Sequence, residues 1–459
     1  MSANAAFLWQ CHPDAEKWIL EKVEHSLNSN ATSRQLKENL LSQTSTRLFD
    51  WLDYIVIDFS EEEQNKITDL GFTQQEITSE YLVYHHQGAQ FPRIVFNQNN
   101  SALKGMAVNV DSIADFLLAR GGENVEIEGV NFGCFRRCPI YIYGREALWA
   151  VERKGTQTLV PTNESPETIL TYHEALEKWQ TRFRGNEDET QAIHETLELA
   201  KNLVSQIGTH RAAWTVLEGE RRYWQLRNSA GQIQKSRQDR LGMGWSNHDH
   251  HTFRSSRKNF AKLVHLFEIL GFVCRERYYA GEEAGWGAQI MENLTCRLVL
   301  FLDVDLDPHE IQGDIAHEPL PELKQLGTIG LWCGLHGDSI LKAGMHHLEA
   351  QFMFDDLTQD LSRAGVKMMK PFSSFSFLKQ AFTVGENWPV DPLRVETLLK
   401  EQKISEEQAN KFLLRGAIGS HLENLQRREG YKGFNQKNVS QIIKETDPRG
   451  KNFDFDKSL

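Results

Sequence analysis

The chain has 459 residues, with 63 acidic and 51 basic side chains and a net charge of −12. This length predicts two or three domains with ample buried core. The acidic balance argues against a nucleic-acid partner and against docking on an anionic membrane, because both need clustered Lys and Arg. The chain does not begin with a basic and then apolar leader, and it has no apolar run of about 18 residues, so we expect a soluble, cytoplasmic protein.

The cysteines stand at positions 11, 134, 138, 274, 296 and 333. An even count of this kind can form a disulfide set, but that interpretation suits short secreted chains. Cys134 and Cys138 are not followed by a second pair at zinc-ribbon spacing. We therefore expect free, mostly buried thiols in a reducing compartment.

The first part of the chain predicts helices over residues 13–50 and then one order of elements twice over: a strand, a helix and further strands. The first unit has a strand at 51–59, a helix capped by Ser60 and stopped by Gly71, and strands at 80–86 and 93–96. The second unit has a strand at 105–110, a helix at 112–120 stopped by Gly121-Gly122, and strands at 125–127, 135–143 and 147–153.

Residues 164–240 are charged, largely poor in Pro and Gly, and helical in period, which predicts a helical connector. The order of strand, helix and strands then returns twice. The third unit has a strand at 247–254, a helix at 258–270 and strands at 272–279, 287–292 and 297–305. The fourth unit has a strand at 345–354, a helix at 357–364 and strands at 366–370 and 377–384. An irregular Gly-rich insertion at 306–344 separates them, and residues 392–446 are again predicted to be helical.

Four βαβββ units in two pairs resemble the vicinal oxygen chelate superfamily, which includes glyoxalase I and extradiol and hydroxyphenylpyruvate dioxygenases. Short motifs carry this resemblance. DHHTFR at 249–254 and MHHLEA at 345–350 match the starts of two modules, and FEILGF at 267–272 follows the first of them at the expected distance. The segment 135–150 also resembles a stretch of the two-oxoadipate dioxygenase group.

The N-terminal pair of units has the same frame without the ligands. Tyr54 stands where the resemblance would place a histidine, and the segment 105–108 also lacks one. The resemblance therefore implies an α+β fold of two half-open barrels, one of which holds a metal. The expected regions are N-terminal helices at 1–50, a module pair without ligands at 51–160, the connector at 164–240, a metal-binding pair at 241–391 and a C-terminal helical region at 392–459.

The resemblance implies a divalent metal held by His250 and His347, with a carboxylate late in the fourth module. We choose Glu386 for this third ligand, with Glu292 as the alternative. Two imidazoles and one carboxylate are typical of non-haem Fe(II) oxygenases, so Fe(II) is favoured, with Zn or Mn as alternatives.

Strand alternation places Arg254 on the same face as His250, about 13 Å farther along the strand, where it could bind a substrate carboxylate. Gln351 holds the matching place in the fourth module and could donate to a substrate oxygen. The expected function is a metal-dependent dioxygenase or a glyoxalase-like enzyme acting on a small carboxylate- or oxoacid-bearing substrate. A non-catalytic small-molecule-binding protein on the same scaffold is the alternative, and a homodimer is left open.

Two simpler interpretations stand beside these. The histidines at 248–251 could form a solvated edge strand, and Glu386 could be a surface loop residue before Asn387. The second His-His pair at 346–347, in the matching place of another module, is what favours a metal. The chain has no Walker motif and no GxSxG elbow, and no GxGxxG follows a predicted strand.

Overall fold

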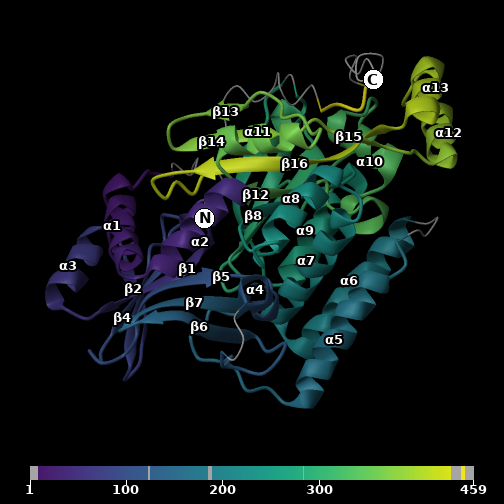
Figure 1. Ribbon diagram of the computed structural model, residues 1–459. Helices are drawn as coiled ribbons and strands as arrows, with labels where there is room; N and C mark the ends of the chain where they lie inside the picture. The colour runs from purple at the N-terminus through teal and green to yellow at the C-terminus, as the bar shows by residue number, and fades with distance from the viewer. Residues whose placement is uncertain (1–8, 122–124, 185–188, 283, 436–445, 450–459) are drawn as a thin grey trace.

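A computed structural model describes residues 9–121, 125–184, 189–282, 284–435 and 446–449 of the protein. The rest, which includes the outer parts of the predicted terminal regions and Gly122, lies outside the described residues. Two β-sheets form the frame, one in each half of the chain, and helices cover their outer faces (Figure 1). Across the described residues, none of the helices is long and apolar enough to cross a membrane.

The N-terminal sheet has seven strands in the order β2-β3-β4-β1-β5-β7-β6. β1 runs parallel to β4 and β5 runs parallel to β7, while β1 and β5 pair antiparallel, so two βαβββ modules lie side by side. The elements of this half are α1 (Pro13–Ser29), α2 (Ala31–Thr44), β1 (Leu52–Asp58), α3 (Glu61–Asp69), β2 (Thr73–Ile77), β3 (Tyr81–His85), β4 (Arg93–Asn97), β5 (Lys104–Asn109), α4 (Ile113–Arg120), β6 (Phe135–Tyr143) and β7 (Glu146–Arg153).

Four helices form the connector, as the periodicity predicted. They are α5 (Pro166–Thr181), α6 (Glu189–Ile207), α7 (Thr209–Gln225) and α8 (Ser229–Asp239). Ser165 caps α5, since its side chain accepts from the backbone N–H of Thr168. The apolar face of these helices packs on the C-terminal half, and the buried Trp179 and Trp224 belong to the same core as Phe253 and Leu422. The connector is therefore part of the C-terminal core rather than a spacer.

The second sheet has nine strands, with the main order β13-β14-β16-β12-β8-β11-β10-β9. It again consists of two modules, joined where β8 and β12 pair antiparallel. Its elements are β8 (His248–Arg254), α9 (Phe260–Ile269), β9 (Val273–Tyr279), β10 (Trp286–Asn293), β11 (Leu298–Asp305), α10 (Thr328–His336), β12 (His347–Gln351), α11 (Phe354–Arg363), β13 (Ser373–Ser374), β14 (Leu378–Phe382), β15 (Glu386–Trp388), α12 (Pro392–Lys400), α13 (Glu406–Arg415) and β16 (Ala417–Arg427). The predicted fold class, α+β with four modules in two pairs, is confirmed.

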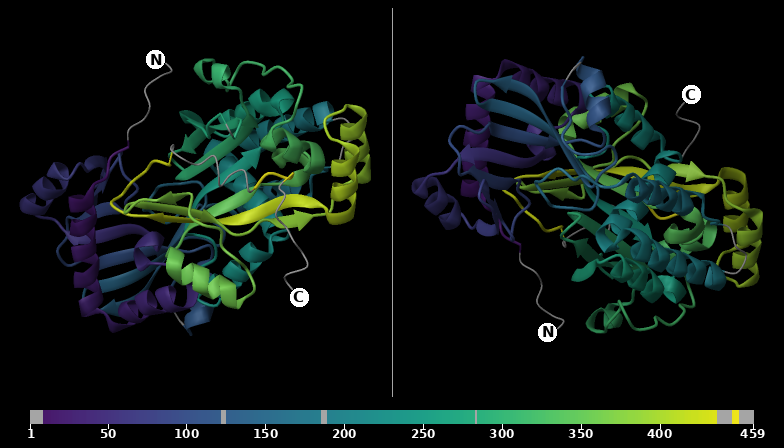
Figure 2. Two further views of the ribbon diagram at one scale, coloured as in Figure 1. Left: turned by 90° about the horizontal axis from the view of Figure 1, so that it is seen from above. Right: turned by 90° about the horizontal axis from the view of Figure 1, so that it is seen from below.

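The prediction of continuous helix over 392–446 is wrong for residues 417–427, which form the long strand β16. Figure 2 shows β16 running from the α12–α13 end of the molecule toward the N-terminal half. Leu, Glu, Gln and Arg favour helix, and they continue the helical period of α13 into LENLQR at 422–427. Tertiary burial overrides that preference, because β16 lies between β12 and β14 in the middle of the sheet. The last strand of the fourth module therefore comes after residue 391, not at 377–384.

Gly416 makes the turn from α13 into β16. Its φ of +67° is a left-handed conformation, and a Cβ atom there would lie 2.2 Å from the carbonyl oxygen of Trp388. A glycine is therefore required at this close approach.

Two smaller differences from the predicted elements concern the same half of the chain. The insertion predicted to be irregular contains α10, and the strand predicted at 366–370 is reduced to one bridge between Met368 and Thr383.

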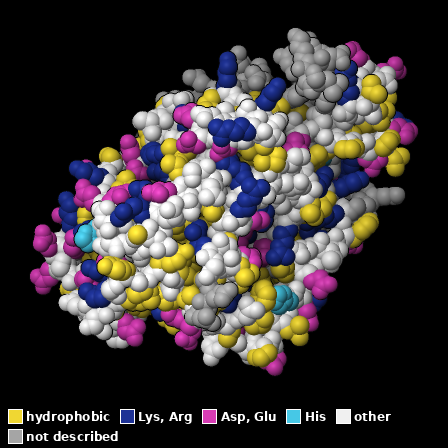
Figure 3. All heavy atoms as spheres, in the orientation of Figure 1, with side chains coloured by type: hydrophobic (Ala, Val, Ile, Leu, Met, Phe, Trp, Pro, Cys, Tyr) yellow, Lys and Arg dark blue, Asp and Glu magenta, His cyan; other side chains and the backbone are white. Residues whose placement is uncertain are grey.

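Charged side chains of both signs are interspersed over the face of the molecule drawn in Figure 3, with apolar atoms scattered between them. This surface agrees with the acidic but mixed composition of the chain. On this face the basic side chains do not merge into one continuous patch.

The position of β16 gives a stability prediction. Leu422 is fully buried in the C-terminal core, whereas Leu414, eight residues earlier on α13, is 81% exposed. We expect Leu422→Ala to lower the free energy of unfolding by about 2–5 kcal/mol, because it leaves a cavity in a packed core. The matched Leu414→Ala should change it by less than about 0.5 kcal/mol. Urea unfolding checks both, and equal effects would contradict the buried strand.

Candidate metal centre

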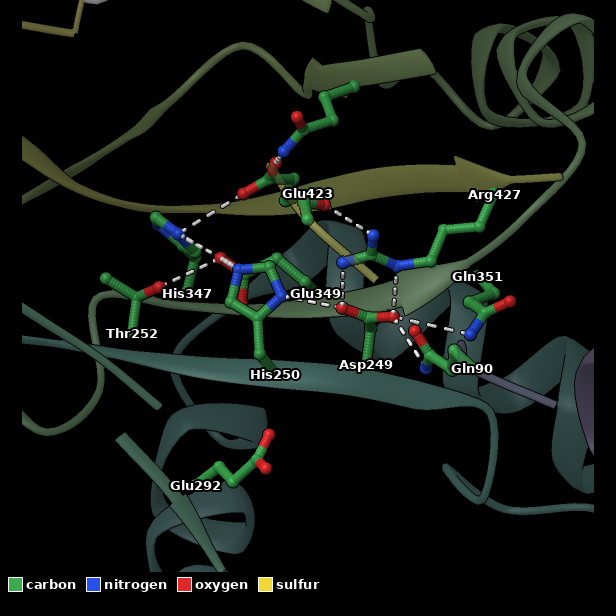
Figure 4. Close-up of polar contacts among 12 residues, drawn as sticks. Gln90, Asp249, His250, Thr252, Glu292, His347, Glu349, Gln351, Glu423 and Arg427 are labelled. Carbon is green, nitrogen blue, oxygen red and sulfur yellow. Dashed lines mark hydrogen bonds and ion pairs between the residues drawn. The ribbon is translucent and has the colours of Figure 1, made fainter. Parts of the chain in front are cut away.

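Three adjacent strands bring four metal-ligand side chains together at the centre of the larger sheet. β8 supplies His250, β12 supplies His347 and Glu349, and β16 supplies Glu423 (Figure 4). The register explains the meeting, because Glu349 is paired with His250 on one side and with Glu423 on the other. Residues paired across strands point to the same face, so all four side chains enter one space.

The four side chains are within contact distance of one another. His250 Nε2 lies 2.8 Å from Glu349 Oε1, and His347 Nε2 lies 2.5 Å from the same oxygen. His347 Nε2 is also 3.4 Å from Glu423 Oε2. One carboxylate oxygen of Glu349 is thus approached by two imidazole nitrogens, and the hydroxyl of Thr252 donates to it as well, at 2.8 Å.

A buried carboxylate behind His250 fixes the orientation of its ring. His250 Nδ1 lies 2.9 Å from Asp249 Oδ1, and since a carboxylate can only accept, Nδ1 carries the hydrogen. Asp249 is held in turn by Arg427, whose Nε and Nη2 donate at 2.9 and 3.0 Å, and by the amides of Gln90 and Gln351 at 3.0 and 3.3 Å. The lone pair of His250 Nε2 consequently faces the centre.

A second imidazole stands behind His347. His421 Nε2 lies 2.9 Å from His347 Nδ1, and the two rings stack with their centroids 4.6 Å apart. The ring of Phe382 stacks on His421 and also contacts His347. The ring of His346, the residue just before β12, packs against the rings of both His347 and His421. These contacts hold His347 so that Nε2, not Nδ1, points at the two glutamates.

Burial controls the charges at this centre. It lowers the pKa of His250 and of His347, so both imidazoles are neutral near pH 7. It raises the pKa of Glu423 to about 8. Burial, and then the neighbouring Glu423, also raise the pKa of Glu349 well above its ordinary value. Without a cation, the two carboxyl groups therefore keep protons that they would lose in water.

The donor set fits a divalent metal ion. Neutral imidazole nitrogens and carboxylate oxygens are the ligands of zinc and of non-haem iron. His250, Glu349 and Glu423 each offer an atom within 4.8 Å of the others, and Glu349 Oε2 is buried without a hydrogen-bond partner among the described residues. Lone pairs that face each other at these distances need a proton or a cation between them. The residues present are therefore sufficient to hold a metal.

A small cavity of about 50 Å³ opens on this centre. This is room for a metal ion with a few water-sized ligands. Its walls are mostly aromatic, and its polar atoms come from a few side chains besides the four donors. The lining residues are His250, Thr252, Tyr278, Trp286, Phe301, Asp303, His347, Glu349, Phe372, Gln380, Phe382, Glu423, Phe434 and Asn435.

Arg254 lies behind this cavity on the face of β8 that carries His250. It is buried, its Nε is 3.8 Å from Asp303 Oδ2, and its Nε and Nη1 have no hydrogen-bond partner among the described residues. Burial lowers the pKa of Arg254 to about 10 and raises the pKa of the cavity residue Asp303 to about 7. Arg254 does not itself line the cavity, but its guanidinium lies beside Asp303, which does.

The structure brings His250 and His347 together, but it places the other predicted ligands elsewhere. The carboxylate of Glu386 accepts from Ser229 and from the backbone N–H of Ala230, at the start of α8. Glu292 pairs with Arg275 and Lys432, and Figure 4 shows it well apart from the centre. Gln351 lies behind His250, where its amide donates to Asp249 instead of facing the cavity.

Sequence reasoning missed Glu423, Glu349 and His421. The alternation His421-x-Glu423 could have signalled a strand with two inward donors, but the segment was interpreted as helix. Strand alternation puts Glu349, two residues after His347, on the same face, but the sequence alone does not single it out as a ligand. The third carboxylate was sought before residue 391, because the module was expected to end there.

Comparison with known proteins yields structural matches alone. No protein-family model matches the chain, and no curated protein matches it. A triple mutant of 4-hydroxymandelate synthase from Streptomyces coelicolor matches with a TM-score of 0.29 and 11% identity, over 86% of this chain and 98% of that one. Methylmalonyl-CoA epimerase from Mycobacterium tuberculosis matches with a TM-score of 0.23 and 11% identity, over 40% of this chain and 89% of that one.

These TM-scores are far below 0.5 and the identities are low, so the matches carry no statement about the activity of this chain.

The ion pair behind His250 gives a stability prediction. We expect Arg427→Met to lower the free energy of unfolding by about 3–5 kcal/mol, because it leaves the buried Asp249 carboxylate without its cation. The double variant Arg427→Met/Asp249→Asn should recover part of this loss. Lys400→Met, which breaks an exposed pair with Glu396, should have no measurable effect. Urea unfolding at pH 7 compares the three, and a single Arg427 variant as stable as the Lys400 variant would contradict the role of the pair.

Proposed function

We propose that this protein is a non-haem metal-dependent enzyme whose metal is held by His250, His347 and Glu423, with Glu349 as a further carboxylate beside it. The observation that carries the proposal is the meeting of two imidazole Nε2 atoms and two carboxyl groups in one buried space. His250 and His347 were chosen from the sequence, and Glu423 takes the place proposed there for Glu386. The position of Glu423 on the last strand of the fourth module, beside His347, supports this assignment.

We favour Fe(II) as the metal and a dioxygenase as the activity, with Zn or Mn as alternatives. Two histidines and one carboxylate on one side of an Fe(II) ion leave positions open for substrate oxygens and dioxygen, which is the chemistry that such an ion supplies. The chain's own part is to hold these ligands. Asp249 and His421 fix the two rings, and the aromatic walls of the cavity keep bulk water from the reacting atoms.

The second carboxylate supports a glyoxalase-like activity as the second candidate. Two histidines and two glutamates would suit a metal that does not change its oxidation state, and a carboxylate displaced from the metal can take a proton from a substrate. Glu349 is the residue for this role, because Thr252 donates to it and its pKa is raised by burial and by Glu423.

For the substrate, we propose a small carboxylate- or oxoacid-bearing molecule. The cavity is small, and Arg254 offers a buried guanidinium with unused donors on the same strand as His250. Gln380, whose amide donates to Glu423 at 3.1 Å, and Asp303 are further polar groups on the wall. We assign Gln351 to supporting Asp249 rather than to contacting the substrate.

Metal content tests the ligand set. We expect the His250→Ala/His347→Ala double variant to hold about one divalent metal per chain fewer than the unmodified protein. Glu423→Gln should lose most of the metal, whereas the matched Glu386→Gln should keep it, because its carboxylate is bound at α8. Elemental mass spectrometry measures all four. Retention in Glu423→Gln with loss in Glu386→Gln would contradict the proposed set.

Oxygen consumption separates the two candidate activities. Turnover of a small 2-oxo acid with uptake of dioxygen supports the dioxygenase, and turnover without it supports the glyoxalase-like enzyme. A folded protein that holds no metal at His250 and His347, and whose ligand affinity is unchanged by chelator, would instead be the non-catalytic binding protein that is the alternative from the sequence.

Metal affinity should depend on pH through the carboxyl groups. In the metal-free protein the pKa of Glu423 is raised to about 8, so below that pH an incoming metal must displace its proton. We expect apparent affinity to rise from roughly pH 6 to pH 8, by about tenfold per pH unit for each carboxyl proton that the metal displaces. Calorimetric titration with Zn²⁺ or Mn²⁺ at several pH values measures it. A flat profile over this range would exclude a proton on the ligand set.

A further inference from the structure

A second group of metal-ligand side chains lies at the outer edge of the third module. It comprises Glu268 at the end of α9, Cys274 on the edge strand β9, and His317 in the segment between β11 and α10. Cys274 is exposed, unlike the buried thiols expected from the sequence, and His317 is exposed as well. Three separate elements thus present a thiol, a carboxylate and an imidazole to one point on the surface.

The distances suit a small ion. Glu268, Cys274 and His317 each offer one ligand atom, and these three atoms lie within 4.8 Å of one another. A tetrahedral zinc ion holds its ligand atoms roughly 3.5 Å apart, so side-chain rotations of about 1 Å would close the site. His265, one turn before Glu268 on α9, has its Nδ1 3.7 Å from the other carboxylate oxygen, so a further imidazole lies next to the three donors.

The imidazole of His317 is already oriented for a metal. Its Nδ1 lies 2.8 Å from Asp314 Oδ2, and its Nε2 lies 2.8 Å from Glu268 Oε1. A carboxylate behind the non-ligating nitrogen is the usual support of a histidine on zinc. The surroundings of the thiol are also anionic. Partial burial, then Glu268 and Asp314, raise the pKa of Cys274 to about 11, against the opposing effect of Arg277.

We propose that Cys274, His317 and Glu268 form a zinc site, with His265 or water as the fourth ligand and Asp314 holding His317. A thiolate, an imidazole and a carboxylate together favour Zn²⁺ over the oxygen-preferring Mg²⁺ and Ca²⁺. Binding breaks the S–H bond of Cys274 and releases its proton to solvent as the Zn–S bond forms. The ion fastens the segment between β11 and α10 to the third module, at a place independent of the central cavity.

Cobalt spectroscopy on the full-length protein tests this site. Co²⁺ bound by a thiolate has a near-ultraviolet sulfur-to-metal charge-transfer band, and the central His and Glu ligands contain no sulfur. We expect titration with Co²⁺ to develop this band up to about one cobalt per chain at the site, and Zn²⁺ to remove it. The His250→Ala/His347→Ala variant should keep the band, which separates this proposal from the function proposed for the central site.

Four variants complete the test. Cys274→Ser should abolish the band, whereas Cys11→Ser should keep it, since Cys11 belongs to no donor cluster among the described residues. Asp314→Asn should weaken cobalt binding about 10- to 100-fold, because it removes the support of the imidazole. His317→Ala should weaken it further. Absence of the band in the unmodified chain, or its persistence in Cys274→Ser, would show an ordinary surface ion-pair cluster and overturn the proposal.

Discussion

The close approach of uncharged imidazole nitrogens to carboxylate oxygens, in a place shielded from water, is the constraint on which the C-terminal half depends. His250 Nε2 and His347 Nε2 both face Glu349, and Glu423 stands beside it. Such acceptors repel one another unless a proton or a metal ion lies between them, and burying them unpaired is costly. A proton or a cation at this point would resolve that conflict, and the contacts around it keep the donor atoms facing inward.

Those contacts reach into both halves of the molecule. Arg427, at the end of β16, neutralises Asp249, and Gln90 of the N-terminal half donates to the same carboxylate. The chain after β16 also joins the N-terminal half directly, where the backbone N–H of Gln90 donates to the carbonyl of Gly430 at 2.9 Å. The orientation of the His250 ring thus depends on contacts between segments that are far apart in sequence.

The two halves use the same frame for different purposes. Asp53 and Tyr54 on β1 occupy the place that Asp249 and His250 occupy on β8, as the motifs had indicated. In the N-terminal half the buried Asp53 is surrounded by three guanidinium groups, those of Arg93, Arg153 and Arg297. Burial alone would raise the pKa of Asp53, but these groups outweigh it and hold the value far below its usual range. Arg297 comes from the C-terminal half of the chain, so its ion pair with Asp53 links the two halves.

The sequence by itself determined the module order, the central pair of histidines and the strand faces they occupy. These follow from local signals: period-2 alternation, glycine stops after short helices, and two His-His pairs at matching places. It did not determine the third carboxylate. Glu386 lies just beyond the expected last strand but is bound at α8, whereas Glu423 lies beyond two helices, on a strand whose residues favour helix. Only pairing with β12 and β14 makes that segment extended and turns Glu423 inward, and such long-range pairing leaves no local trace in the chain.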